Sequence, residues 1–302
     1  MDTTASVSVL IVSYGNYSGL EYTVKSVLKQ SYPIREIILS DDGSKKPFPK
    51  HILGLFKVAP CEVIIREGTT NLGTTAHLNY IANMSHGTYL KFLAAGDAFA
   101  SENSLKELVT FAQQWNTAVI SSNTEVCSQN LKKKYYEFPG LARGSNLKCS
   151  GDQQFRILAK SNIISAVGTL FHRDFFEEQG GFDESYRLLE DWPTWLRLSK
   201  KGDAIPFLDC VTCLQALGGV STRKCDAYQS EVLRTDMIRC YEQEILPEIS
   251  RFKKIEQRKI RYRYEELTGR NARILWVRYF DLHLQVKIKR KIKTWIIQNS
   301  NS

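Results

Sequence analysis

The sequence has no run of the roughly 20 consecutive apolar residues that a bilayer-spanning helix needs. Its first residues, Met1-Asp2-Thr3-Thr4, also lack the basic and apolar segments of a secretory signal peptide. We therefore expect a protein that is not exported and that works in the cytoplasm.

Cysteine is sparse and scattered. The seven cysteines are odd in number and irregularly spaced, which suits reduced thiols better than a disulfide framework. Cys210 and Cys213 have CxxC spacing, but no second pair or histidine pair stands at the spacing of a zinc site. Buried thiols are the simpler interpretation of this pair.

Two common nucleotide-binding motifs are missing as well. The sequence contains neither GxGxxG, which marks a dinucleotide-binding fold, nor GxxxxGK[ST], which marks a P-loop. Any nucleotide must therefore be held by another arrangement of residues.

Acidic residues are few toward the carboxyl end. The net charge is +9, and residues 251–293 hold fifteen Lys and Arg against four acids. Amphipathic helices are predicted over residues 229–246 and 250–267, followed by basic stretches around Trp276 and Trp295. Such a tail indicates a polyanionic partner, either a membrane leaflet or nucleic acid.

The tryptophans within this basic tail favour an anionic membrane surface. No nucleic-acid-binding motif accompanies the tail, so we do not expect a nucleic acid partner. The alternative is a solvated helical bundle that merely packs on the rest of the protein.

The amino-terminal third alternates between strand and helix patterns. Residues 7–14 form a β-branched run, residues 20–28 have helical periodicity, and residues 36–40 form a second buried run. Strand, helix and strand in this order predict a βαβ unit and a parallel sheet. The segments 61–66, 74–85 and 89–93 repeat the pattern.

Acidic turns follow two of these strands: Asp41-Asp42-Gly43-Ser44 and Ala94-Ala95-Gly96-Asp97. Ligands of open α/β sheets bind outside the carboxyl ends of the strands, so both turns are expected at one ligand-binding edge. Asp97 is well placed to hold a metal ion or a polar substrate, and Gly96 lets a ligand approach the backbone. The alternative is a strand-ending turn in which Asp97 caps the next helix.

The order, spacing and types of these residues resemble the nucleotide-binding half of the inverting family 2 glycosyltransferases with the GT-A fold. The resemblance covers residues 7–14, the Asp41 turn, Asn71-Leu72-Gly73 and the segment from His86 to Asp97. It implies an α/β fold with a mostly parallel central sheet flanked by helices. It also implies sugar transfer from a UDP-sugar.

The resemblance assigns roles on the nucleotide side. Tyr14 and the turn after the first strand would pack on the uracil ring, and Asp41 would accept a hydrogen bond from the base. The other nucleotide-sugar-binding residues in this prediction are Val12, Asp42, Asn71, Gly96 and Asp97.

Asp97 matches the last acid of the family's DxD-type motif, which ligates Mn²⁺ or Mg²⁺ on the diphosphate. The family often has acids where this chain has Ala94 and Gly96. A carboxylate contact to the ribose is therefore missing. A single carboxylate with phosphate oxygens and water is still a reasonable ligand set for either ion.

Residues 180–198 resemble the family's acceptor-side signature. A loop, Gly180-Gly181-Phe182-Asp183-Glu184, precedes Glu190-Asp191-Trp192 and apolar residues at helical spacing. A carboxylate near a helix N-terminus is favoured in its ionised form, so it can accept a proton. The resemblance makes Asp191 the general base, whereas the alternative is a helix cap without a catalytic part. The further acceptor-side candidates are Glu190, Trp192 and His172.

The sequence thus predicts a GT-A catalytic domain over residues 1–222, with a nucleotide-binding half (1–100) and an acceptor half (101–222). A basic helical extension follows over residues 223–302. We expect a metal-dependent inverting glycosyltransferase that moves a sugar from a UDP-sugar to a hydroxyl of a saccharide acceptor in polysaccharide or glycan assembly. A lipid-linked acceptor would place the enzyme on the inner face of the cell membrane.

Two alternatives remain open. The first is a degenerate, non-catalytic module that binds sugar nucleotides, because acids are missing at positions 94 and 96. The second is a nucleotidyltransferase, which would carry a glycine-rich loop with Lys or Arg after the first strand. Residues 15–19 contain no such cation.

Overall fold

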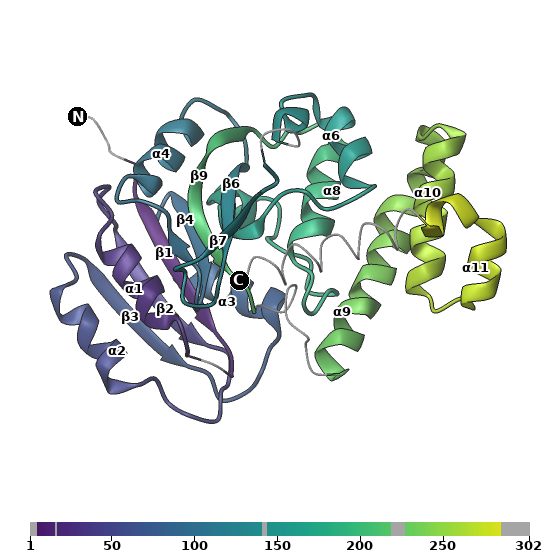
Figure 1. Ribbon diagram of the computed structural model, residues 1–302. Coiled ribbons are helices and arrows are strands. Elements are labelled where there is room, and N and C mark those ends of the chain that lie inside the picture. Colours follow the sequence, from purple (N-terminus) through teal and green to yellow (C-terminus); the bar gives the residue numbers. More distant parts are fainter. Residues whose placement is uncertain (1–4, 16, 141–143, 219–226, 285–302) are drawn as a thin grey trace.

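The computed structural model describes residues 5–15, 17–140, 144–218 and 227–284 (Figure 1). In this part of the chain a nine-stranded sheet has the order β3-β2-β1-β4-β8-β6-β9-β5, and β7 pairs with β6. The strands are β1 (Val7–Ser13), β2 (Glu36–Asp41), β3 (Glu62–Glu67), β4 (Tyr89–Ala94), β5 (Ala98–Phe99), β6 (Val119–Cys127), β7 (Lys134–Phe138), β8 (Leu170–His172) and β9 (Phe207–Ala216).

Helices cover the sheet and form the carboxyl-terminal part. The α-helices are α1 (Leu20–Leu28), α2 (Lys50–Leu55), α3 (Thr74–Met84), α4 (Ser104–Ala112), α6 (Gly151–Leu158), α7 (Asp174–Glu177), α8 (Asp191–Lys201), α9 (Ala227–Cys240), α10 (Lys254–Leu267) and α11 (Ala272–Arg278). Short helical turns are η1 (Phe56–Val58), η2 (Ser145–Leu147), η3 (Ala166–Gly168), η4 (Tyr241–Ile245, π-helical) and η5 (Leu246–Arg251).

The predicted βαβ arrangement is confirmed in the amino-terminal half. Strand β1 pairs in parallel with both β2 and β4. The register sets Ser13 opposite Asp41 and Val12 opposite Ala94. The carboxyl ends of the three strands therefore meet at one edge of the sheet.

Alternation along β1 builds a hydrophobic core on each face of the sheet. Val9 and Ile11 belong to a cluster with residues of α1, α2 and α4, whereas Leu10 belongs to one with residues of α3, α6 and α8. Successive side chains of a strand point to opposite faces, which explains this division. The result is a three-layered α/β/α arrangement (Figure 1).

The second half of the sheet is mixed. Strand β8 runs antiparallel to β4 and to β6, and β9 returns parallel to β6. Directly after Asp97, β5 pairs antiparallel with β9. The end of β9 is thereby brought beside the Asp97 turn.

The part of the extension that the structure describes packs against the catalytic fold through α9 and η4. Cys240, Tyr241 and Ile245 are buried in the same cluster as Phe155 of α6 and Trp195 of α8. Helices α10 and α11 lie farther from the sheet (Figure 1) and share a small cluster of their own. No helix in the described ranges is both long and apolar enough to cross a membrane.

The predicted helix over residues 250–267 is confirmed as α10, which begins four residues later, at Lys254. The helix predicted over residues 229–246 corresponds to α9 and η4, but helical turns continue past its predicted end through η5 to Arg251, with a proline in the first turn of η5. Proline is tolerated there, since the amide hydrogen that it lacks has no intrahelical acceptor. The predicted boundary at 222/223 and the basic segment 286–297 lie outside the described residues.

Candidate active site

Backbone hydrogen bonds order the edge where β1, β2 and β4 end. The amide of Asp42 donates to the carbonyl of Ser13 (2.9 Å), and the amide of Ala95 donates to the carbonyl of Val12 (2.8 Å). Tyr14 follows β1 and is half exposed at this edge. These bonds extend the parallel register into the turns that carry Asp41 and Asp97.

The Asp41 carboxylate is buried and held in one orientation. It accepts hydrogen bonds from the Ser44 hydroxyl (2.6 Å), the Ser44 amide (2.5 Å), Ser13 Oγ (3.2 Å) and Tyr17 OH (3.2 Å). Beneath it, Ser40 and His77 are hydrogen-bonded at 2.7 Å, and burial lowers the pKa of His77 to about 4. His77 is therefore neutral and structural at neutral pH.

Asp42 supports a neighbouring turn. Its two carboxylate oxygens accept the amide hydrogens of Leu72 (2.8 Å) and Gly73 (3.0 Å). Burial raises the pKa of Asp42. Through these contacts Asp42 fixes the turn that contains Asn71. This turn lies next to the edge where β1, β2 and β4 end, which we call the nucleotide-side edge.

Asp97 presents one free carboxylate oxygen. Its Oδ1 accepts the amide hydrogen of Ala216, at the end of β9, at 2.9 Å, while Oδ2 has no hydrogen-bond partner among the residues that the structure describes. The side chain keeps partial exposure, yet burial by the surrounding protein raises the pKa of Asp97 to about 7.

Glycines bring the start of α1 against the Asp97 turn. Gly96 has φ +108°, and its amide donates to Thr23 Oγ1 at 2.9 Å. A Cβ on Gly19, at the start of α1, would lie 2.8 Å from Gly96 Cα. A side chain at position 19 would therefore push the turn away, and only glycine fits the contact.

Asp97 is the residue of this edge that could ligate a divalent cation. No group of three or more His, Cys, Asp or Glu side chains within the described ranges could hold a metal by itself. One anchored carboxylate with a free oxygen suits a hard cation that takes its other ligands from phosphate and water. The chain's own residues thus fit a cation that arrives with a diphosphate.

Asp191 begins helix α8, where its carboxylate is oriented by two donors. Oδ2 accepts from Asn162 Nδ2 (2.8 Å), and Oδ1 accepts from the amide of Trp192 (2.6 Å). Burial and the charge of Asp191 raise the pKa of Glu190 to about 8. The pKa of Asp191 is also raised by burial, but its donors favour the ionised form. Of the two carboxyl groups, Asp191 is therefore the one whose ionised form the local hydrogen bonds favour.

Arg187 ties the segment before α8 to the nucleotide-side edge. Its guanidinium donates to Asn71 Oδ1 (2.6 Å), to the Asn71 carbonyl (3.1 Å) and to the Leu72 carbonyl (3.2 Å). The amide of Thr75, in α3, donates to the Arg187 carbonyl (3.3 Å). Asp42, the Asn71 turn and the Arg187 segment therefore form a continuous link toward Asp191.

Replacing Arg187 by lysine is expected to lower the free energy of unfolding by about 1–2 kcal/mol, because an ammonium cannot reproduce the forked contact. Urea unfolding measures this change. Arg261→Lys, at an exposed position of α10, is the control and should unfold like the wild type. An unchanged midpoint for the Arg187 variant would show that the fork does not hold the two segments together.

The structure also places two further acceptor-side candidates, Trp192 and His172. Trp192 is buried, and its indole nitrogen donates to the Leu158 carbonyl (2.9 Å), so its visible role is packing. His172 ends β8 opposite Tyr89, the first residue of β4, while Asp97 follows the other end of that strand. The two ends are about 16 Å apart at 3.3 Å per residue. This placement sets His172 at the opposite edge of the sheet from Asp97, and its acceptor-side role stays a prediction.

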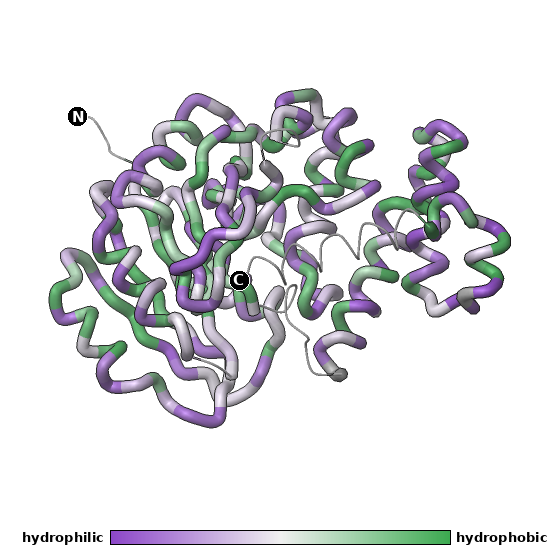
Figure 2. The backbone as a smooth tube through the Cα atoms, viewed as in Figure 1, coloured by the Kyte–Doolittle hydropathy of each residue, from purple (hydrophilic) through white to green (hydrophobic). Residues whose placement is uncertain are grey.

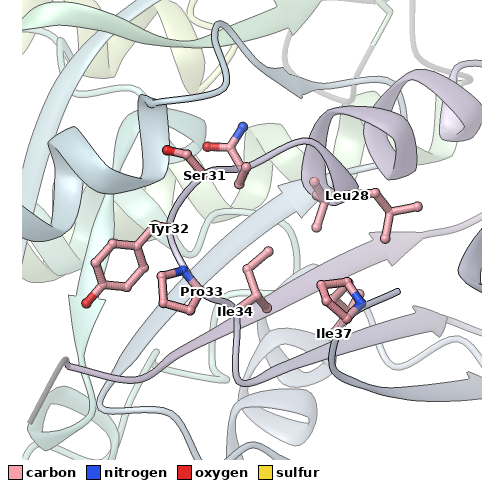
Figure 3. Close-up of a pocket in the computed structure, with 9 residues that line it drawn as sticks. Leu28, Ser31, Tyr32, Pro33, Ile34 and Ile37 are labelled. Atoms are coloured by element: carbon pink, nitrogen blue, oxygen red, sulfur yellow. The ribbon is translucent and has the colours of Figure 1, made fainter. Parts of the chain in front are cut away.

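A cavity of about 200 Å³ also lies away from these acids (Figure 3). It is lined by the end of α1, the following turn with Tyr32 and Pro33, and Ile37 near the start of β2. Asp41 ends the same strand. The cavity is therefore at the opposite edge of the sheet from the candidate site.

The family model described as glycosyl transferase family 2 matches residues 8–180, more than half of the chain. The chain belongs to glycosyl transferase family 2. It is therefore a glycosyltransferase, and the predicted family is confirmed. The matched residues stop before Asp191, so the model does not cover the candidate base.

Two curated relatives of this family 2 glycosyltransferase come from Bacillus subtilis. TuaG, whose name describes a teichuronic acid biosynthesis glycosyltransferase, is 25% identical over 197 residues, which are 65% of this chain and 73% of TuaG. GgaA, named as a minor teichoic acid biosynthesis protein, is 29% identical over 196 residues. That match covers 61% of this chain and 41% of GgaA.

Solved structures share the fold. S. aureus TarS 1–349 in complex with UDP-GlcNAc has a TM-score of 0.56 at 13% identity, covering 87% of this chain and 81% of that one. The mannosyltransferase PcManGT from Pyrobaculum calidifontis, in complex with GDP-Man and Mn²⁺, has a TM-score of 0.55 at 15% identity. This match covers 86% of this chain and 69% of that one. At these identities the likeness shows the fold alone, and it confirms the predicted GT-A architecture.

Several residues that shape the site were not predicted from the sequence. Asn162 orients Asp191 from 29 residues away, and Arg187 reaches the Asn71 turn across 116 residues. The Ala216 amide meets Asp97 across 119 residues. No local pattern identifies such contacts. The position of Arg187 between the acceptor loop and Glu190 was the one available signal.

Proposed function

We propose that this glycosyltransferase is metal-dependent and inverting, and that it transfers a sugar from a UDP-sugar to a hydroxyl of a lipid-linked saccharide. The observation that carries the proposal is the Asp191 carboxyl group, oriented by Asn162 and the Trp192 amide at the end of a segment that Arg187 ties to the nucleotide-side edge. The names of TuaG and GgaA support teichoic- or teichuronic-type polysaccharide assembly as the setting.

The donor is held at the carboxyl edge of β1, β2 and β4. Tyr14 is exposed enough to pack on a uracil ring. Asp41 would accept a hydrogen bond from the base through Oδ2, which accepts only the Ser44 amide hydrogen among the residues that the structure describes, whereas Oδ1 already accepts three hydrogen bonds. The complexes of TarS with UDP and UDP-GlcNAc support a UDP-sugar for this chain.

Asp97 would hold Mn²⁺ or Mg²⁺ together with oxygens of the donor diphosphate. When bound, the cation stabilises negative charge on the departing diphosphate. The contact to the Ala216 amide fixes the Asp97 carboxylate, so the second oxygen is ready for a ligand without reorientation. The Mn²⁺ complex of PcManGT supports this assignment.

Asp191 accepts the proton of the acceptor hydroxyl as its oxygen attacks the anomeric carbon. Asn162 and the Trp192 amide keep the carboxylate in place and favour its ionised form, while burial and the Asp191 charge raise the pKa of Glu190 to about 8. Attack comes from the face opposite the diphosphate, so the anomeric configuration inverts. We expect general-base catalysis of this kind to contribute about 10²–10⁴-fold.

A panel of UDP-hexoses with Mn²⁺ and a lipid-linked saccharide acceptor tests the proposal. UDP release identifies the donor, and proton NMR of the product reports the configuration of the new linkage. The expected result is inversion. Retention of configuration would exclude attack assisted by a base opposite the leaving group, and failure to bind any UDP-sugar would favour the non-catalytic module.

An exposed apolar surface on the extension supports a membrane partner. We call it the α11 surface, and its members are Ile274, Trp276, Val277, Phe280 and Leu284, which are 49–76% exposed. Figure 2 shows hydrophobic and hydrophilic residues interleaved at this end of the molecule. Large exposed apolar groups next to a basic sequence are typical of proteins that lie on an anionic bilayer.

The double variant Trp276→Ala/Phe280→Ala is expected to bind vesicles containing phosphatidylglycerol at least about tenfold more weakly, because it removes buried aromatic area at the interface. Vesicle sedimentation measures the change. The matched control is Trp115→Ala, since Trp115 is exposed to the same extent, 51% against 52%, but lies in the catalytic fold. An equal loss of vesicle binding in both variants would contradict a docking role, and so would binding that does not depend on salt concentration and lipid charge.

A further inference from the structure

One face of α9 and η4 forms hydrogen bonds and ion pairs with the segment around Asp191. We call it the α9 face, and it consists of Asp236, Arg239, Gln243 and Glu244. Asp236, Arg239 and Gln243 recur at three- and four-residue spacing, which places them on one side of a helix, and Glu244 directly follows Gln243. Each contacts a residue between Asp183 and Lys200.

Asp236 makes the contact nearest to Asp191. Its side chain is 4% exposed, and its Oδ2 accepts the amide hydrogen of Leu188 at 2.6 Å. The neighbouring amides of Arg187 and Leu189 partly offset the rise that burial causes in the pKa of Asp236. The backbone shortly before Asp191 is therefore held by one buried carboxyl group of the extension.

The other members of the α9 face hold the same segment on both sides of Asp191. Arg239 donates to the Ser185 carbonyl, and Gln243 accepts from Tyr186 OH at 3.1 Å. Glu244 pairs with Arg197 of α8 at 2.7 Å, and the same guanidinium reaches Asp183 at 2.5 Å. The acceptor loop, α8 and the extension are thus joined by hydrogen bonds and ion pairs.

We propose that Asp236 is a positioning residue for the transfer reaction, which sets the direction of Asp191 by fixing the backbone of residues 187–189. This inference rests on the proposed role of Asp191. Arg187 anchors the segment to the nucleotide-side edge through its side chain, while Asp236 anchors the next residue, Leu188, through its amide. Two opposing anchors leave the peptide before Asp191 little freedom to rotate.

The consequence concerns the extension. Residues that follow the predicted domain boundary complete the acceptor side of the active site, so the extension is part of the catalytic unit. A surface that docks through α10 and α11 would then be connected, through α9, to the residue that receives the acceptor's proton.

Asp236→Ala should lower kcat for transfer about 30-fold, since hydrogen bonds to a buried charge are lost near the base. The donor KM and donor hydrolysis without acceptor should stay within about twofold. Asp236→Asn keeps an acceptor oxygen and should restore most activity, leaving kcat about 3–5-fold below wild type. Glu231→Ala removes an exposed carboxylate of the same helix that pairs with Arg234, and it should behave as wild type.

Hydrogen exchange of the peptide covering residues 183–192 separates positioning from general stability. Exchange at the amides of 187–189 should be faster in both Asp236 variants, with global unfolding unchanged in the asparagine variant. If Asp236→Ala does not fold, the asparagine variant decides by the same two measurements. Wild-type turnover and exchange in that variant would overturn the proposal.

Failure of this inference can be told apart from failure of the proposed function. Wild-type turnover by Asp191→Asn would remove the base itself, and with it both proposals. An inactive Asp191→Asn beside a fully active, folded Asp236→Ala would overturn the positioning role alone.

Discussion

Asp191→Asn is expected to lower kcat for sugar transfer about 10²–10⁴-fold, because an amide cannot accept the proton of the attacking hydroxyl. Asparagine keeps the shape of the side chain, and its amide oxygen can still accept from Asn162 or the Trp192 amide. The nucleotide-side edge is untouched, so the Kd for the UDP-sugar should stay within about twofold. Steady-state UDP release and isothermal titration with the donor measure the two quantities.

Asp174→Asn is the matched control for this prediction. Asp174 also stands in the first turn of a helix, α7, but its side chain is about half exposed and pairs with His172. Its loss should leave transfer unchanged. A weakened donor Kd together with a lowered kcat in Asp191→Asn would show that the residue acts on the nucleotide and not on the acceptor.

Asp97→Ala is expected to lower transfer at least about 100-fold at saturating Mn²⁺, since the ligand of the cation on the departing diphosphate is lost. Asp203→Ala, an exposed carboxylate after α8, is the control. Isothermal titration of UDP with and without Mn²⁺ should show that the cation strengthens binding to the wild type and not to the Asp97 variant. Cation-dependent UDP binding in Asp97→Ala would place the metal elsewhere.

The pH dependence follows from the raised pKa of Asp97. Burial shifts this pKa from 3.8 to about 7, so the free enzyme holds a proton that a bound cation must displace. UDP–Mn²⁺ affinity should therefore increase between pH 6 and pH 8, with a proton released on binding. Titrations in buffers of different ionisation enthalpy measure that proton.

The free energy of unfolding should fall as pH rises, whereas the UDP–Mn²⁺ affinity should increase. Between about pH 4 and pH 7 the folded protein keeps a proton on Asp97 that the unfolded chain has released, so the free energy of unfolding falls as pH rises through this window. At pH 8 the penalty is at most about 4 kcal/mol. Asp97→Asn should thus gain stability over wild type at pH 8 and little at pH 4. If the free energy of unfolding of Asp97→Asn differs from that of the wild type by the same amount at both pH values, Asp97 is not held protonated.

The nucleotide half could be predicted from the sequence because its signals are local. Strand runs, helical periodicity and the turns at Asp41 and Asp97 lie within short windows, and the parallel register then brings their ends together. The role of Asp42 was harder to predict. Its carboxylate binds the amides of Leu72 and Gly73, a contact that closes a distance of about thirty residues.

The acceptor side was predicted less completely, because its parts come from distant segments. Asn162 and Asp236 meet the residues around Asp191 through packing of α8 and α9, which no periodicity reports. The position of His172 at the start of β4 could not be predicted for the same reason, since no local pattern shows that β8 runs antiparallel to β4. Trp192 is buried, and its indole nitrogen donates a hydrogen bond to the Leu158 carbonyl. Sequence patterns cannot distinguish such a core tryptophan from one that stacks on a ligand.

A crystal structure of the enzyme with Mn²⁺ and the UDP-sugar selected by the donor panel is the most direct test of the account. It predicts an anomalous Mn²⁺ peak bound to Asp97 and the diphosphate, with the Asp191 carboxylate facing the anomeric carbon from the opposite side of the sugar. A diphosphate bound away from Asp97, or a sugar whose reactive face points away from Asp191, would contradict it.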